Sequence, residues 1–163
     1  MEKNSLLEKQ ITPEDFLEEV KRKDQSTEER VDCFANLKLL QDPDIEKKFT
    51  DATEDIRKKY FQLLGLTFLH CAQLTGFRED CDLKDVISFL EQAISSEEKG
   101  FAFAGNLAYK RATLAYFKKD IEGLKRYTDE YALYDDWNIP ILKNMLQGLE
   151  ERGFPNYKED YKM

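Results

Sequence analysis

The chain contains one histidine, His70, in a mostly apolar stretch that runs from 60 to 74. A histidine that acts as a general base needs a nucleophile and an orienting acid close to it in space, and the sequence carries no motif that supplies them. Its neighbour Cys71 is poorly placed to share a metal ion with it, because adjacent side chains on a helix diverge by about 100°. We therefore expect His70 to be a core or helix-end residue with one hydrogen bond.

Cysteine and carboxylate side chains indicate no catalytic or metal site either. Cys33, Cys71 and Cys81 show no Cys-x-x-Cys spacing, so we expect buried thiols in a reducing compartment and no metal. Paired carboxylates such as Glu97 and Glu98 are expected on solvated helix faces or in first turns, where the helix dipole favours negative charge. No phosphate-binding loop or nucleophile elbow occurs. We predict a protein that is not an enzyme and needs no cofactor.

Aromatic side chains gather around one predicted helical hairpin, and they are Tyr109, Tyr116, Tyr127, Tyr131, Tyr134 and Trp137. Tyr127, Tyr131 and Tyr134 are spaced by four and three residues, so they share one helix face. Asp135 and Asp136 follow directly. Tyrosine and tryptophan are favoured at interfaces, so this group predicts a surface for a basic segment of another protein. The alternative is an ordinary core with the hydroxyl groups at its edge.

A second group of candidate binding residues precedes these aromatics on one predicted helix face. Its members are Asn106, Tyr109, Lys110 and Thr113, which follow the i, i+3, i+4, i+7 spacing. An asparagine and a lysine on this face could hold a peptide backbone or a carboxylate. The alternative is a solvated helix face without a ligand.

The elements that position these groups are all predicted to be helices. Glycine (7) and proline (4) are scarce among 163 residues, and no segment alternates with a period of two. Helix starts are indicated at Thr12, Asp42, Asp82 and Asp120, with a further cap at Ser26 or Thr27 and stops at Gly76 and Gly153. The segment 45–76 is the longest, and Thr50 or Thr53 could divide it into two helices.

These patterns predict an all-α fold, an irregular antiparallel bundle of six to eight helices with α-solenoid-like hairpins as one form of it. Because residues 60–74 are apolar on nearly every side, they should form a buried central helix. We expect a flexible lead-in over 1–11, a single helical domain over 12–153 and a C-terminal tail over 154–163.

Residues 105–134 resemble one helical hairpin of the tetratricopeptide repeat type. Ala108, Ala112 and Ala115 place small side chains where two helices would cross, and Gly123 follows the turn. The turn itself is Lys118-Lys119-Asp120, where such repeats usually carry glycine. The resemblance covers about thirty residues and implies a helical-hairpin array with a surface that binds a peptide or a protein.

The formal net charge of −8 limits the choice of partner. It argues against nucleic acid and against an anionic membrane surface, and it favours a basic protein. The N-terminus lacks the apolar core of a signal peptide, so we expect a cytoplasmic protein. We predict a protein–protein interaction domain, either an adaptor or chaperone or an inhibitor of the immunity-protein type. The alternative is a helical bundle with a tyrosine-lined pocket that binds a small molecule or performs an uncharacterised reaction.

Overall fold

The computed structural model describes residues 12–25, 33–101 and 103–162, and it is all-helical over these ranges, as predicted. The expected lead-in over 1–11 and the expected cap at Ser26 or Thr27 lie outside the described residues. Within these ranges, eight helices of seven or more residues pack together, and a ninth, α10, forms a single turn. In chain order the helices are α2 (Pro13–Gln25), α3 (Cys33–Leu40), α4 (Pro43–Thr50), α5 (Glu54–Gly76), α6 (Leu83–Lys99), α7 (Ala104–Phe117), α8 (Ile121–Ala132), α9 (Ile139–Arg152) and α10 (Tyr157–Asp160).

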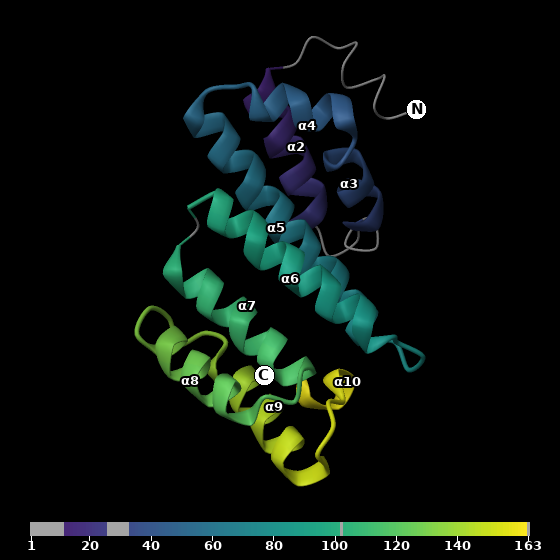
Figure 1. The fold of residues 1–163 in the computed structure, drawn as a ribbon, viewed down its shortest axis with the longest axis vertical. Helices are drawn as coiled ribbons and strands as arrows, with labels where there is room; N and C mark the ends of the chain where they lie inside the picture. Colours follow the sequence, from purple (N-terminus) through teal and green to yellow (C-terminus); the bar gives the residue numbers. More distant parts are fainter. Residues whose placement is uncertain (1–11, 26–32, 102, 163) are drawn as a thin grey trace.

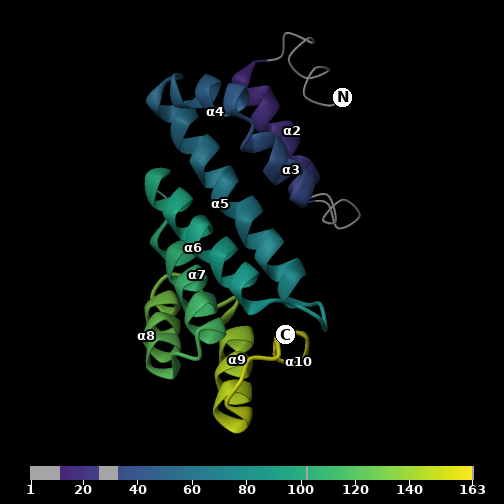
Figure 2. The ribbon, with the colours of Figure 1, turned by 45° about the vertical axis from the view of Figure 1, so that its right-hand side comes forward.

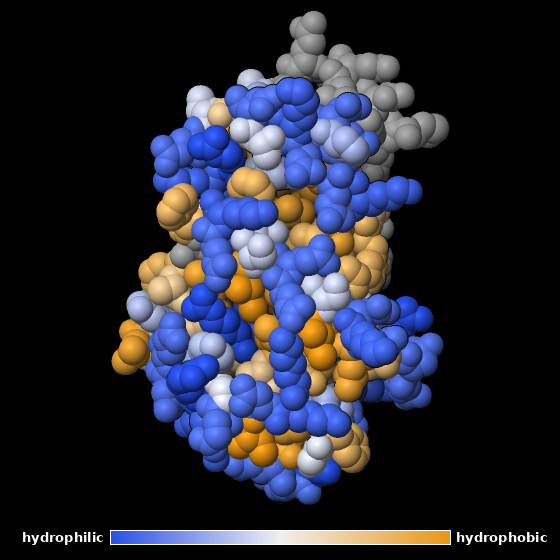
Figure 3. Space-filling model, in the orientation of Figure 1, coloured by the Kyte–Doolittle hydropathy of each residue, from blue (hydrophilic) through white to orange (hydrophobic). Residues whose placement is uncertain are grey.

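The helices form an elongated stack in which neighbours in the chain are also neighbours in space. Figures 1 and 2 show α2, α3 and α4 at one end, α5 and α6 side by side in the middle, and α8, α9 and α10 at the other end. The most extensive contacts join α5 to α6 and α7 to α8. On the face in Figure 3, hydrophilic residues predominate, and hydrophobic ones show between them through the middle and toward the lower end.

Local capping determines where several helices begin and where α9 ends. Carboxylate or hydroxyl side chains accept hydrogen bonds from first-turn backbone N–H groups, which otherwise lack a partner inside the helix. The break in segment 45–76 falls at one of these residues, Thr53. Gly153 ends α9 in the left-handed region at φ 79°, which glycine adopts without strain. The capping side chains are Asp42, Thr53, Asp82 and Asp120.

Helix α5 is the central element, as its composition predicted. It contributes Tyr60 and Phe68 to the apolar cluster shared with α2, α3 and α4, and Leu69 and Ala72 to the cluster shared with α6 to α10. It is apolar on nearly every side because both ends of the stack pack against it. Although α5 has 23 residues, neither it nor another described helix has a stretch long and apolar enough to cross a bilayer.

The C-terminal segment differs from the expected tail. Helix α10 lies against α9 and the core, and Tyr157 is only 2% exposed. The Tyr116 hydroxyl donates to Asp160 over 2.6 Å, and Arg152 pairs with the same carboxylate. A side chain at Gly148 of α9 would overlap Asp160. Helix α10 therefore packs against α9 at a position where α9 has no side chain. The sequence of 154–163 is polar, but these tertiary contacts make it part of the domain.

Candidate functional site

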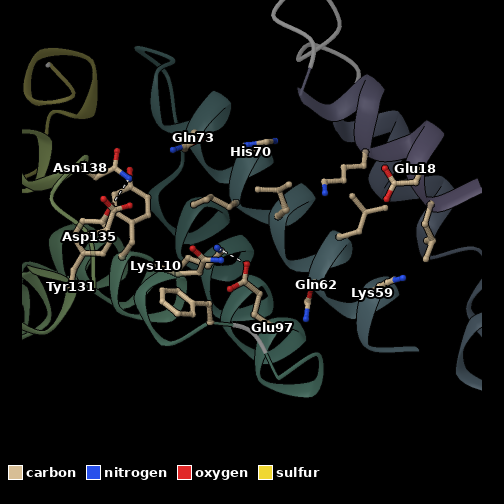
Figure 4. Close-up of a pocket in the computed structure, with 18 of the residues that line it drawn as sticks. Glu18, Lys59, Gln62, His70, Gln73, Glu97, Lys110, Tyr131, Asp135 and Asn138 are labelled. Atoms are coloured by element: carbon tan, nitrogen blue, oxygen red, sulfur yellow. Dashed lines mark hydrogen bonds and ion pairs between the residues drawn. The ribbon is translucent and has the colours of Figure 1, made fainter. Parts of the chain in front are cut away.

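A groove with a volume of about 870 Å³ crosses the stack from α2, over α5 and α7, to the turn between α8 and α9. Figure 4 shows Glu18 and Lys59 at one end and Tyr131, Asp135 and Asn138 at the other. Apolar side chains from α5 line the middle, and they are Leu63, Leu66 and Leu69. The groove is therefore built by helices from both ends of the chain.

Carboxamide and imidazole side chains follow the groove along most of its length. Gln62, His70 and Gln73 come from α5, and Asn106 and Asn138 come from α7 and the α8–α9 turn. His70 is half-buried in the wall next to Gln73, so it lies beside the groove rather than in the core (Figure 4). These groups donate and accept hydrogen bonds, as the main chain of a peptide requires.

At the α2 end the groove is acidic. Glu14, Asp15 and Glu18 line it together with Lys59. The Lys59 ammonium lies 3.8 Å from Glu14 and 3.2 Å from Asp55, and these carboxylates raise its pKa. All of these side chains are largely exposed, so each pairing is worth little in water, and a cationic ligand could compete for the carboxylates.

A buried ion pair lies midway along the groove. The Lys110 ammonium of α7 is 2.5 Å from the Glu97 carboxylate of α6, and each side chain is 4% exposed. Burial lowers the pKa of Lys110, and the carboxylate beside it opposes that shift. A methyl group at Gly65 of α5 would overlap Glu97, so the pair fits because α5 has no side chain there.

The structure brings half of the predicted binding residues to this groove. Asn106, Tyr109, Lys110, Tyr131 and Asp135 all line it. Of the three tyrosines predicted to share a face, Tyr131 lies in the wall, and its ring centroid is 5.8 Å from that of Tyr109. Both rings are buried, and they fix the shape of the groove more than they offer free surface to a ligand.

Two of the predicted residues pack against neighbouring elements and do not line the groove. Thr113 is 1% exposed, and its hydroxyl donates to the Tyr109 carbonyl one turn earlier, so it belongs to the interior of α7. Tyr127 is half-buried against the core, and the Arg126 guanidinium lies 4.7 Å from its ring centroid. Helical spacing places both side chains correctly along their helices, but it does not show which direction the packed neighbours leave open.

The remaining predicted residues, Tyr134, Asp136 and Trp137, are exposed in the α8–α9 turn. The Tyr134 ring lies 5.5 Å from that of Phe103, which lines the groove from the α6–α7 connection. Large apolar side chains that are 47% to 79% exposed lie on these two connections, and we call them the apolar rim: Phe101, Phe103, Leu133, Tyr134 and Trp137.

The main residue that the sequence analysis missed is Glu97, which was expected on a solvated face. It follows Val86, Leu90 and Ala93 at spacings of four, three and four, and all three are fully buried. This periodicity was the available signal, because a carboxylate that continues a buried stripe needs a buried partner. Its neighbour Glu98 is exposed and pairs with Arg111, as a solvated face requires.

The cysteines are placed without metal-site geometry. Cys33 and Cys71 are buried with their Sγ atoms 3.4 Å apart, and Cys81 lies apart from them and is half-buried. Among the described residues, no group of three or more His, Cys, Asp or Glu side chains could hold a metal ion.

No protein-family model, no curated protein and no solved structure matches this chain. The assignment of a function therefore rests on the geometry and charge of the groove and its rim.

Proposed function

We propose that this protein binds an extended, net basic segment of a partner protein in the groove. The observation that carries the proposal is the exposed apolar rim, from which Phe103 lines the groove and packs against Tyr134. Soluble proteins rarely expose several large apolar side chains together unless they bind something there. Trp137 and Tyr134 are 68% and 47% exposed, and these residue types most often supply binding energy at interfaces.

The charges along the groove favour a basic segment. Carboxylates outnumber lysines among the lining residues, with Glu14, Asp15, Glu18, Glu97 and Asp135 against Lys21, Lys59 and Lys110. Asp136 adds a further exposed carboxylate beside the rim. With a net charge of −8 on the whole chain, a cationic segment would be attracted at long range and held at both ends of the groove.

The shape of the site favours an extended segment over a folded surface. The groove crosses several helices and has carboxamide side chains along it, which can bond to a main chain without regard to sequence. Helix α7, in the segment that resembles a tetratricopeptide hairpin, presents Asn106, Tyr109 and Lys110 to it. This mode suits an adaptor or chaperone better than an inhibitor that covers a globular target.

A random-peptide display library selected on the immobilised full chain tests the proposal. We expect enriched peptides to contain lysine or arginine near an aromatic or aliphatic residue, and their affinity to fall with added salt. Trp137→Ala should weaken binding by about fivefold or more. Phe154→Ala is the matched control, because Phe154 is 53% exposed but lies in the α9–α10 connection and does not line the groove.

Peptides that bind the Trp137→Ala and wild-type chains equally well would contradict this assignment. A peptide selection that enriches no sequence, together with thermal stabilisation of the chain by a small molecule, would favour the second candidate function, a small-molecule site. The groove volume supports that candidate, because about 870 Å³ lies within the usual range of roughly 300–1,000 Å³ for such pockets.

A further inference from the structure

The Glu97–Lys110 pair has hydrogen-bonding capacity that the described part of the chain leaves unused. Glu97 Oε1 accepts from Lys110 Nζ over 2.5 Å, while Glu97 Oε2 is buried and has no hydrogen-bond partner. An ammonium group has three donors, and among the described residues only Glu97 pairs with Lys110. A buried acceptor without a partner is destabilising, so this oxygen favours a ligand that brings a donor.

The pair is held in a fixed place by three successive helices. Glu97 comes from α6 and Lys110 from α7, and Gly65 of α5 leaves the space that the Glu97 side chain fills. Figure 4 shows both side chains between the acidic α2 end of the groove and its far end at Tyr131. A segment lying along the groove from one end to the other would therefore pass the pair.

The chemistry of the pair selects a neutral ligand group. A second cation would compete with Lys110 for the carboxylate, and a second anion would compete with Glu97 for the ammonium. In either case an unbalanced charge would remain in a site of low polarity, which is costly. An uncharged group with both an acceptor and a donor leaves the net charge at zero and satisfies both partners.

We propose that the Glu97–Lys110 pair is a carboxamide-binding subsite, which takes a peptide group or an asparagine or glutamine side chain of the bound segment. Lys110 Nζ donates to the amide oxygen, and the amide N–H donates to Glu97 Oε2. This inference rests on the proposed function, because the segment in the groove supplies the amide. It adds that the residue over the pair is neutral, although the segment as a whole is basic.

The subsite can be tested on the full chain without knowing the partner, by two-dimensional NMR with acetamide, acetate and methylammonium as probes. We expect acetamide to shift the backbone signals of Gly65, Glu97 and Lys110 saturably, and the two ions to leave them unchanged at the same concentration. In Glu97→Gln the pair becomes cationic, so the preference for acetamide over acetate should fall by about tenfold.

Glu98→Gln is the matched control, because it alters the exposed partner of Arg111 one residue further along and should keep the acetamide preference. Acetamide that leaves these signals unshifted, or that binds no better than acetate to the wild-type chain, would overturn the subsite. Both of these outcomes are measured on the wild-type chain, so they do not depend on whether the Glu97→Gln chain folds. Saturable acetamide binding alongside an empty peptide selection would support the subsite and count against the proposed peptide ligand.

Discussion

Replacing Lys110 by methionine tests the buried pair at the centre of the groove. The substitution keeps an unbranched side chain but leaves the Glu97 carboxylate, 4% exposed, without its cation. Removing one partner of a buried ion pair destabilises a protein by about 3–5 kcal/mol, because the remaining charge stays desolvated. Proteins of this kind have about 5–15 kcal/mol of stability in total, so the loss is large but should leave a folded state to measure.

The chain supplies a matched control between α6 and the residue that follows α7. Lys118 pairs with Glu91 of α6 at 2.7 Å, but these side chains are 46% and 53% exposed. Lys118→Met should therefore lower the free energy of unfolding by only about 0.2–1 kcal/mol. The difference between the two variants isolates the effect of burial, since one ion pair joins α6 to α7 and the other joins α6 to the turn directly after α7.

Urea unfolding of the two variants and the wild type measures the difference. With an m-value of about 2 kcal/mol per molar urea, Lys110→Met should lower the midpoint by about 2 M. The double variant Glu97→Met with Lys110→Met should recover most of the loss, because a packed apolar pair replaces the charges. If Lys110→Met costs no more than Lys118→Met, the pair is solvated, and the reasoning about the subsite is refuted along with it.

Three further perturbations test the packing that supports the site. Gly65→Ala should lower the free energy of unfolding by about 1–3 kcal/mol because the methyl group overlaps Glu97, whereas helix propensity alone predicts a higher stability. A higher urea midpoint in this variant would count against the close α5–α6 contact. Gly148→Ala overlaps Asp160, so hydrogen exchange in α10 should become faster, and unchanged protection would place α10 elsewhere. Burial raises the pKa of several tyrosines, so above pH 10 these side chains ionise in the unfolded chain before they ionise in the folded one. Each such tyrosine should therefore lower the free energy of unfolding by up to about 1.4 kcal/mol per pH unit, and its stabilising contribution is complete only below pH 10. Constant urea midpoints through this alkaline range would contradict the last prediction, which concerns Tyr60, Tyr109, Tyr116, Tyr131 and Tyr157.

Helix boundaries could be predicted from the sequence because they depend on contacts within a few residues. Asp42, Asp82 and Asp120 cap the helices that follow them, and Gly153 ends α9, as their residue types indicated. The central position of α5 could also be predicted, since a helix that is apolar on nearly every side must be covered on nearly every side.

The sequence also identified part of the groove, and the reason is geometric. Asn106, Tyr109 and Lys110 lie at spacings of three and four residues on one helix, so they had to share a face wherever α7 packed. Thr113 follows the same spacing but is covered by neighbouring elements. Periodicity fixes which side chains point the same way, but the direction that stays open depends on the neighbours.

Only the tertiary structure decided the features that join distant parts of the chain. Glu97 and Glu98 are adjacent and chemically identical, yet one is buried against Lys110 and the other is exposed beside Arg111. The periodicity of α6 indicates that Glu97 continues a buried stripe, but only the packing shows that α5 leaves room for its side chain at Gly65. By itself the sequence determined a helical, acidic chain with the starts of α4, α6 and α8 and the end of α9 correctly placed. The placement of charge, amide and aromatic groups around one groove depended on how these helices pack, because packing distances between helices are set by side chains far apart in the sequence.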